Sequence, residues 1–353
     1  MISVVKILVA PDKFKGSLGA SEVAENSASG LRDVLPHAEI TCMPVADGGE
    51  GTASVICAAA RGESHSCEVH DPLGRIVTAR YCTIENGRTA VMEMSQASGL
   101  WRLAPDERDP LRASTFGTGE MLLDATKRGV REIIIGLGGS ATNDGGFGMA
   151  RALGFRFLNT QGEETCELTE VARVIAPNQL RLPRITAAVD VRNPLLGPRG
   201  ATRVFGPQKG ARPDQIELLE EALRRFAQVV GGDTNLPGAG AAGGLGFGLT
   251  SLCHAELRPG FDVVAERIRL RDAIRAHDVV ITGEGRLDAQ TLEGKAPAGV
   301  AKLARTEGKR VFAIVGASTN GSELFERVFV VGSMENAAAL VRERARELGR
   351  LLC

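Results

Sequence analysis

Charged and hydroxyl side chains gather in several glycine-containing segments, each placed directly after an apolar run. The segment PDKFKGS carries Lys13, Lys15 and Ser17 just ahead of a helix-like stretch that begins near Ala20. Two ammonium groups, a hydroxyl and the free N–H groups of a helix N-terminus together suit an anion. A solvated lysine loop with Ser17 or Ser21 as the helix cap fits the same spacing, so both interpretations stay open.

Carboxylates mark a second segment, ADGGEGT, in which Asp47 and Glu50 bracket Gly48 and Gly49. Glycines allow a ligand to approach the backbone, and the carboxylates suit a hydroxyl group or a magnesium ion. A tight turn with a helix-capping aspartate is the alternative.

Carboxylates and cations occur together in the segment TGEGRLDAQTLEGKAP, which contains Glu284, Arg286, Asp288 and Lys295. This set suits magnesium and phosphate together, although a surface salt-bridge cluster has the same composition. The ending EGKA lacks the Ser or Thr and the earlier glycine of a Walker A loop, so that motif is excluded here.

A long glycine-rich segment, GLGGSATNDGG, runs from Gly136 to Gly146. Its first six residues match the dinucleotide fingerprint G-x-G-x-x-A, which alone is weak support. Asn143, Asp144 and two more glycines interrupt the helix that this fingerprint should open. We therefore favour a phosphate-binding nest of backbone N–H groups, with Ser140 and Asn143 as side-chain donors.

Three isolated charged residues complete the set. Asp190 ends the run ITAAVD, where a lone carboxylate suits a catalytic base or a helix cap. Lys209 lies between glycines in FGPQKGA, a loop that suits a phosphate, and Arg258 in ELRPGFD suits a substrate carboxylate or an exposed surface. None of the five histidines lies in these segments, which argues against zinc sites and histidine-dependent triads. Cations, carboxylates and nests favour phosphoryl transfer.

The elements that must position these residues follow from the apolar runs. Runs such as VVKILVA, EIIIGLG, ITAAV and DVVIT are rich in β-branched residues and end in polar or glycine-rich segments. They alternate with helix-like stretches at 20–35, 213–230, 296–307 and 335–352, which predicts an α/β fold with parallel strands. In open α/β sheets, ligands bind beyond the carboxyl ends of the strands, where the four glycine-containing segments and Asp190 are expected to lie.

Two stretches differ from this rhythm. Residues 71–96 are typical of paired β-strands, with Asn86 and Gly87 as the hairpin turn. Residues 237–249, PGAGAAGGLGFGL, are interpreted as a loop that enters a helix, with a flexible linker as the alternative. The first ~70 and last ~95 residues share the plain strand–helix rhythm. We therefore expect one discontinuous doubly wound domain with a second α/β domain inserted in it.

Composition limits the class of protein. A chain of 353 residues usually forms two domains, and 42 basic against 43 acidic residues give a net charge of −1. This balance, with one Trp and one Tyr, argues against nucleic acid and membrane partners. The seven scattered cysteines form no C-x-x-C pair, which favours a reducing compartment. The N-terminal run is interpreted as a strand, no stretch is long enough to span a membrane, and we expect a cytoplasmic protein.

Eight ordered motifs closely resemble those of the bacterial type I glycerate kinases, and the match runs from Lys6 to about Gly316. The motifs are APDKFKGS, PVADGGEGT, FGTGE with IIIGLGGSATNDGG, VDVRNPLLGPRGA, FGPQKGA, LPGAGAAGGLGFG, ELRPGFDVV and TGEGRLDAQTLEGKAPAGVA. One departure is Lys13, because the family often has PDSFKGS. We therefore expect Lys15 and Ser17, and not Lys13, to be the essential groups of that loop.

The resemblance implies an ATP- and Mg²⁺-dependent kinase that phosphorylates D-glycerate, with 2-phosphoglycerate favoured over 3-phosphoglycerate. It also implies a flavodoxin-like domain, which we place at 1–70 and 258–353, and an inserted α/β domain of restriction-enzyme-like type at 71–257. D-glycerate and ATP are the expected partners, and a homo-oligomer stays open.

Combined with the chemistry above, the resemblance implies a role for each candidate. The catalytic group is Asp190 as proton acceptor with Lys15 and Lys209. The substrate group is Ser17, Asp47, Gly48, Gly49 and Arg258. The ATP group is Gly138, Gly139, Ser140 and Asn143, and the Mg²⁺ group is Glu284 and Asp288. We expect these residues to face a common cleft. The alternatives are a kinase of a related small hydroxy acid, a dinucleotide-dependent oxidoreductase and a metabolite sensor without catalytic activity.

Overall fold

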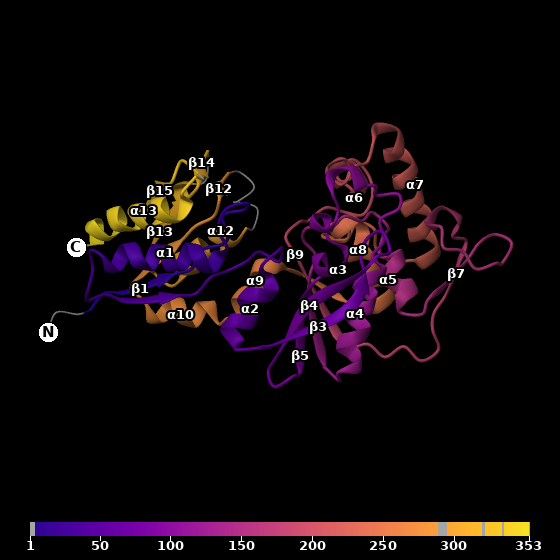
Figure 1. The fold of residues 1–353 in the computed structure, drawn as a ribbon, viewed down its shortest axis with the longest axis horizontal. Coiled ribbons are helices and arrows are strands. Elements are labelled where there is room, and N and C mark those ends of the chain that lie inside the picture. Colours follow the sequence, from indigo (N-terminus) through magenta and orange to yellow (C-terminus); the bar gives the residue numbers. More distant parts are fainter. Residues whose placement is uncertain (1–3, 289–294, 320–321, 334, 353) are drawn as a thin grey trace. The chain divides into compact units, whose positions relative to one another are not determined.

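A computed structural model describes residues 4–288, 295–319, 322–333 and 335–352. The chain divides into two compact units. Unit 1 contains Met1–Asp47, Ser54–Ala59 and Phe261–Cys353, and unit 2 contains Gly48–Ala53 and Ala60–Gly260. Both ends of the chain therefore belong to unit 1 (Figure 1).

Unit 1 is built on a sheet of five strands in the order β15-β13-β11-β1-β2, and every neighbouring pair is parallel. The strands are β1 (Lys6–Val9), β2 (Glu39–Cys42), β11 (Val279–Thr282), β13 (Arg310–Val315) and β15 (Arg327–Val330). Counted along the sheet, this is the order 2-1-3-4-5 of flavodoxin-like, doubly wound folds. The strand order reverses between β1 and β11, which makes this the switch point where ligands bind in such sheets.

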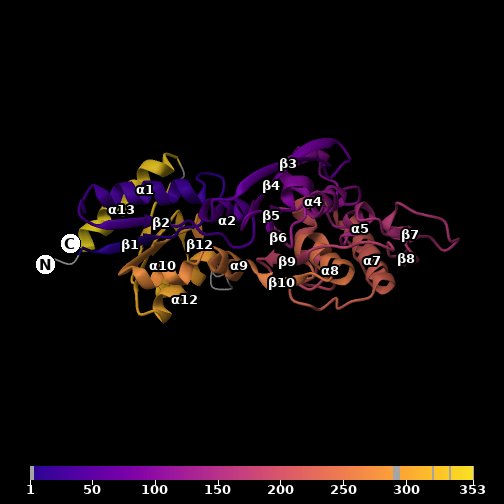
Figure 2. The ribbon, with the colours of Figure 1, turned by 90° about the horizontal axis from the view of Figure 1, so that it is seen from below.

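Helices cover both faces of this sheet. Figure 2 shows α1 (Ala20–Arg32) and α13 (Ala337–Leu352) on one side, and α10 (Leu270–Ala276) and α12 (Ala296–Thr306) on the other. Gly30 lets α1 approach α13, because a Cβ atom there would lie 2.1 Å from the carbonyl oxygen of Arg342. The helices α2 (Thr52–Ala60) and α9 (Gly260–Arg267) and the short parallel pair β12 (Arg286–Leu287) and β14 (Ala317–Ser318) complete the elements near this sheet.

Unit 2 contains a mixed sheet of six strands in the order β10-β9-β6-β5-β4-β3. The antiparallel part is β3 (Glu63–His70), β4 (Ile76–Ile84) and β5 (Thr89–Glu93), and the parallel part continues through β6 (Glu132–Gly136), β9 (Arg184–Val189) and β10 (Glu256–Pro259). The predicted hairpin is confirmed, since β4 and β5 pair from Ile84 and Thr89, with Asn86 and Gly87 at φ of 56° and 78°.

The other elements of unit 2 are mostly helical. They are α3 (Ser95–Ser98), η1 (Leu100–Arg102), η2 (Pro105–Glu107), α4 (Phe116–Lys127), α5 (Phe147–Ala152), η3 (Leu168–Glu170), α6 (Ala201–Phe205), η4 (Pro207–Lys209), α7 (Pro213–Val230) and α8 (Ala241–Cys253), with the small antiparallel pair β7 (Arg156–Leu158) and β8 (Arg173–Ile175). The glycine-rich segment 237–249 enters α8, so the flexible-linker alternative was wrong. The backbone of Ala242, Gly243 and Gly244 is left-handed, and this first turn of α8 is therefore irregular.

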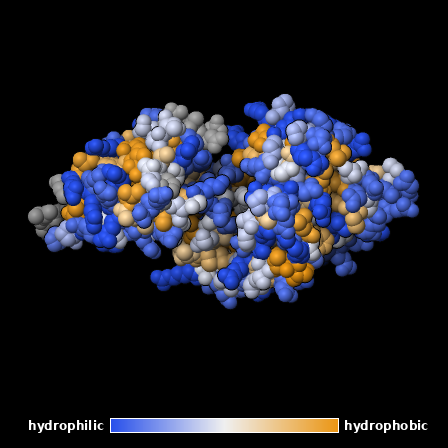
Figure 3. Space-filling view, turned by 45° about the horizontal axis from the view of Figure 1, so that its top comes forward, coloured by the Kyte–Doolittle hydropathy of each residue, from blue (hydrophilic) through white to orange (hydrophobic). Residues whose placement is uncertain are grey.

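Each unit has a core of its own. The unit 1 core includes Ile7, Val279 and Ile314 from its sheet, and the unit 2 core includes Ile133, Phe226 and Phe247. Polar residues cover most of the face drawn in Figure 3, with apolar residues scattered among them, as on ordinary protein surfaces. Among the helices of the described residues, none has the length and apolar character needed to cross a membrane.

Candidate functional site

Three carboxylates of unit 1 follow three neighbouring strands. Asp12 comes after β1, Asp47 after β2 and Glu284 after β11. The loops are tied together by backbone hydrogen bonds, since the Asp12 N–H donates to the carbonyl of Gly283 (2.8 Å) and the Val45 N–H donates to that of Pro11 (2.9 Å). Asp12 and Glu284 therefore lie on the two sides of the switch point of this sheet.

Asp12 is the carboxylate that sequence reasoning missed. Only 7% of it is exposed, and one oxygen accepts the N–H of Lys13 at 2.7 Å. Burial, and then the negative charges of Asp47 and Glu284, raise the pKa of Asp12 to about 8. The cluster therefore holds a proton at neutral pH when no cation is bound. The available signal was an aspartate directly after a buried strand, the same signal that identified Asp190.

Lys295 joins the two carboxylates that were expected to bind a metal ion. Its Nζ lies 3.9 Å from Glu284 and 3.6 Å from Asp288. Lys295 is the N-cap of α12, whereas residues 289–294 of the same motif lie outside the described residues. Arg286 is exposed on β12. The structure thus brings Glu284, Asp288 and Lys295 together.

Lys15 and Ser17 lie in a tight exposed turn next to this cluster. The Ser17 N–H donates to the carbonyl of Phe14 (2.8 Å), and Gly16 between them has φ of +79°. The turn packs on Gly285, where a Cβ atom would lie 3.2 Å from the backbone nitrogen of Lys15. The serine-cap interpretation was wrong, because the N-cap of α1 is Gly19.

The donor set of this cluster suits a magnesium ion. In the part of the chain that the structure describes, no group of three or more acidic, histidine or cysteine side chains is arranged to hold a metal ion alone. Magnesium, however, commonly takes one or two protein carboxylates and completes its shell with water and substrate phosphates. Glu284 and Asp288 supply such oxygens, and a divalent cation would offset both the burial of Asp12 and the repulsion from Asp47 and Glu284 that raise its pKa.

The second set of candidates lies at the carboxyl edge of the unit 2 sheet. Asp190 follows β9 and is exposed, and Arg258 on the adjacent strand β10 pairs with Ala188 and is half-buried. Gly136, at the end of β6, also pairs with Ala188, so Gly138 continues from the same edge. The parallel register therefore brings Asp190, Arg258 and the glycine-rich loop together.

Gly136 and Gly138 are required by close packing of their backbone on Gly48 and Gly49 within unit 2. A Cβ atom at Gly138 would lie 2.5 Å from the Cα of Gly49, and one at Gly136 would lie 2.7 Å from the carbonyl oxygen of Gly48. Gly48 and Gly49 are buried. Glu93, which the sequence did not single out, accepts hydrogen bonds from the N–H groups of Gly51 and Ala53 (both 2.9 Å) and so fixes the start of α2.

The loop from 137 to 146 is clamped on one side by the segment that links α3 to η1. The Leu100 N–H donates to the carbonyl of Gly139 (2.8 Å), and the Ala141 N–H donates to that of Ser98 (2.9 Å). Gly139 is exposed, whereas Ser140 is buried. The next helix begins only at Phe147, so the loop does not open a helix at its glycines as a dinucleotide fingerprint would.

A buried acid and a buried lysine hold the other side of this loop. Asp144 accepts hydrogen bonds from the Thr115 N–H (2.9 Å), the Thr115 hydroxyl (2.8 Å) and the Gly148 N–H (3.1 Å), and burial raises its pKa. Lys209 is 2% exposed and donates from Nζ to the carbonyl of Thr142 at 2.7 Å. Burial lowers the pKa of Lys209 to about 7. The ammonium group thus supports the loop from inside the protein.

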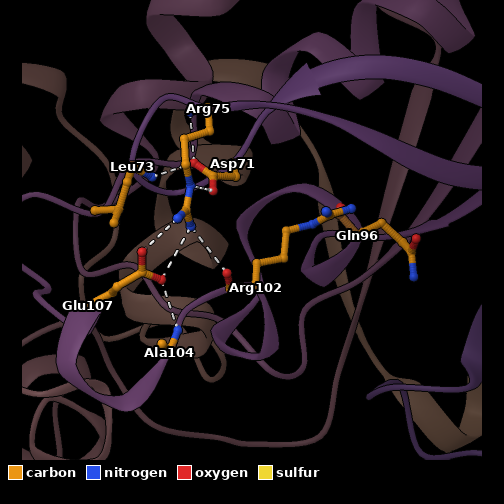
Figure 4. Close-up of polar contacts among 7 residues, drawn as sticks. All are labelled: Asp71, Leu73, Arg75, Gln96, Arg102, Ala104 and Glu107. Carbon is orange, nitrogen blue, oxygen red and sulfur yellow. Dashed lines mark hydrogen bonds and ion pairs between the residues drawn. The ribbon is translucent and has the colours of Figure 1, made fainter.

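A polar network fixes the segment that precedes Arg108 (Figure 4). Arg75 donates from Nε to Asp71 (2.5 Å) and from Nη1 to Glu107 (2.7 Å), and Glu107 also accepts the Ala104 N–H (2.9 Å). A further bond runs from Arg75 Nη2 to the carbonyl of Arg102 (3.2 Å). These bonds hold η1 and η2 in place beside the loop.

Comparison with known proteins identifies close relatives of this chain. A model of the glycerate kinase family matches residues 7–348. A glycerate kinase of Halalkalibacterium halodurans is 44% identical and covers 92% of this chain and 88% of its own length. The glycerate 2-kinase of Escherichia coli is 42% identical, over 90% of this chain and 86% of its own. A crystal structure from Salmonella typhimurium LT2, assigned as a glycerate kinase 2, has a TM-score of 0.88 at 42% identity and covers 99% of this chain and 98% of its own.

Proposed function

We propose that this chain, which belongs to the glycerate kinase family, transfers the terminal phosphoryl group of ATP to the 2-hydroxyl of D-glycerate. The 42% identity to a relative named glycerate 2-kinase supports the choice of the 2-hydroxyl. The observation that carries the reaction type is the set of carboxylates and lysines at the switch point of unit 1. Such a set suits a phosphoryl transfer, which depends on positioning and charge neutralisation.

The residues of unit 1 are assigned to the metal ion and the acceptor. Glu284 and Asp288 would hold Mg²⁺, which when bound neutralises phosphate charge, and Asp47 would bind the substrate hydroxyl or share the metal ion. Lys15 and Ser17 bind the glycerate carboxylate or the phosphoryl group in transfer, since an exposed ammonium and hydroxyl supply the donors that both groups need.

The residues of unit 2 are assigned to ATP and the proton. The backbone N–H groups of Gly138 and Gly139, with Ser140 and Asn143, bind the phosphates of ATP. Asp190 accepts the proton of the attacking hydroxyl on a carboxylate oxygen. Arg258, on the neighbouring strand, binds a carboxylate, and Lys209 adds positive charge behind the loop.

A coupled assay with D-glycerate and MgATP tests the reaction, and phosphorus NMR of the product identifies the hydroxyl. We expect 2-phosphoglycerate. Lactate and 3-hydroxypropionate are useful comparisons, because each keeps only one of the two hydroxyls. Formation of 3-phosphoglycerate would contradict the choice of hydroxyl, and absence of ATP turnover with glycerate would contradict the function itself.

Substitution of Lys15 and Asp190 tests the assigned roles. Lys15→Ala removes a cation that neutralises charge in the transition state, and we expect kcat to fall by about 10²–10³ with a smaller change in KM. Asp190→Asn removes the proton acceptor and should lower kcat by about 10²–10⁴. Lys302→Ala and Asp214→Asn are matched controls on exposed helix positions. Unchanged turnover in Lys15→Ala and Asp190→Asn would show that the assignment is wrong.

A further inference from the structure

Arg108, among the described residues of unit 2, has a guanidinium N–H without an acceptor. Its Nε is buried and makes no hydrogen bond. The two nearest acids in sequence are engaged elsewhere, since Glu107 binds Arg75 and Asp109 accepts the Leu111 N–H (3.0 Å). A buried guanidinium N–H without an acceptor is costly, so its persistence needs an explanation such as a ligand.

Other polar atoms without a hydrogen-bond partner lie in the glycine-rich loop 137–146. Thr142 is fully buried with an unpartnered Oγ1, and Asn143 is 1% exposed with an unpartnered Oδ1. One end of the Asn143 amide contacts the Thr202 hydroxyl at 3.0 Å, and a hydroxyl can donate or accept there. An Asn143 amide turned by 180° would therefore keep this contact and offer its NH₂ group to a ligand.

The backbone segment of Lys209 and Gly210 lies between this loop and Arg108. The Nζ of Lys209 reaches the carbonyl of Thr142, which leaves two of its three N–H donors without a partner among the described residues. Gly210, the next residue, packs directly on Arg108, because a Cβ atom at Gly210 would lie 2.3 Å from the Arg108 carbonyl oxygen and 3.0 Å from the Arg108 Cβ. Arg108 and Lys209 thus belong to adjacent backbone segments.

The segment around Arg108 is held firmly against the loop. Leu103 and Ala113 pack on Ala141 of the loop, and the network of Figure 4 fixes Glu107. Arg108 is therefore placed by contacts on both sides of it in the chain. Its Nε is buried but the side chain as a whole is half-buried, so part of the side chain is accessible to a ligand.

We propose that Arg108, placed beside the loop that contains Thr142 and Asn143, binds the polyphosphate of the nucleotide. Arginine suits this role, since its planar fork of N–H donors matches phosphate oxygens. The proposal rests on the proposed kinase function, which assigns the same loop to ATP, and adds Arg108 as a residue that contacts the nucleotide.

Binding of inorganic tripolyphosphate, measured by titration calorimetry, tests the subsite without catalysis. Arg108→Met should weaken tripolyphosphate and MgATP by about 10- to 100-fold, as expected for the loss of one or two charge-assisted hydrogen bonds. Arg112→Met is the matched control, because Arg112 is an exposed arginine of the same segment. We expect less than about a twofold change in this control. In kinetics, Arg108→Met should raise KM for MgATP more than KM for D-glycerate.

Two results with Arg108→Met would overturn the proposal. One is wild-type affinity for tripolyphosphate in Arg108→Met, and the other is an equal loss in Arg108→Met and Arg112→Met, which would indicate general charge attraction only. If Arg108→Met does not fold, Arg108→Lys is the test variant, because it keeps the charge without the planar fork of donors. We expect Arg108→Lys to bind tripolyphosphate with intermediate affinity, and wild-type affinity in this variant would also contradict the proposal. Tripolyphosphate binding through Arg108 in a protein that does not phosphorylate glycerate would support the subsite and reject only the kinase function.

Discussion

Lys209 keeps an ionisable group in the interior of unit 2, and this links stability to pH. Burial lowers its pKa from 10.5 to about 7, and Asp144 is the acid whose charge opposes that shift. Between these two values the unfolded chain binds a proton that the folded chain does not. The free energy of unfolding therefore rises with pH through this window and is lowest below pH 7, where the buried ammonium stays charged.

Lys209→Met tests this link. Methionine has a similar volume and no charge, and apolar replacement of a buried ion is often neutral or stabilising. Urea unfolding at pH 7 and pH 9 should show that the wild type gains about 2 kcal/mol relative to Lys209→Met as the pH rises. Lys302→Met, at an exposed position, is the control and should follow the wild type. Parallel pH profiles for wild type and Lys209→Met would contradict the lowered pKa of the buried Lys209.

At the scale of elements, backbone contact between glycine segments joins strands to loops in unit 2. The segment 48–49 lies against Gly136, Gly138 and Ala188 at the carboxyl ends of β6 and β9. These contacts leave no room for a side chain. The glycines thus fix the position of the loop that we assign to ATP. This packing role is separate from the room that glycines leave for a ligand.

Gly138→Ala measures the tightness of this contact. The new Cβ atom would lie 2.5 Å from the Cα of Gly49, so backbone must move, and we expect a loss of about 1–3 kcal/mol in thermal or urea unfolding. Gly162→Ala is a control for backbone strain alone, because Gly162 has φ of +85° and open space around it, and should cost about 1 kcal/mol. Equal losses in both variants would show that the contact at Gly138 has no special role.

At the scale of the whole molecule, the sequence predicted the α/β fold and most of the elements that carry it. Period and composition predicted α7 at its observed bounds, 213–230, and the strand runs before most candidate loops, because local pattern determines them. Asp12, Glu93 and Arg108 were missed as candidates. Asp12 had a local signal in its position after a strand, but the contacts that make Asp12 and Glu93 important are with residues far away in the sequence, Glu284 and Gly51, and leave no local pattern.

The position of Lys209 shows the same limit. The flanking glycines of FGPQKGA indicated a phosphate loop, yet the ammonium group lies in the interior against the Thr142 carbonyl. Burial of a lysine depends on which other segments pack over it, and the seven residues of the motif do not contain that information. Sequence therefore predicted which loops matter better than it predicted the role of each side chain in them.

The separate cores of the two units predict separate effects of core substitutions. Phe226 is fully buried in unit 2, with its ring 5.8 Å from Phe157 and 6.0 Å from Phe147 between centroids. Phe226→Ala should cost about 3–5 kcal/mol. The single tryptophan, Trp101, belongs to unit 2, so its fluorescence in a urea titration reports the unfolding of this unit and should shift in Phe226→Ala.

Ile314→Ala removes core atoms from unit 1 and should lower the free energy of unfolding by about 2–5 kcal/mol in the far-UV circular dichroism transition, with a smaller effect on the fluorescence. An equal shift of the tryptophan signal in both variants would show that the two cores unfold as one cooperative structure.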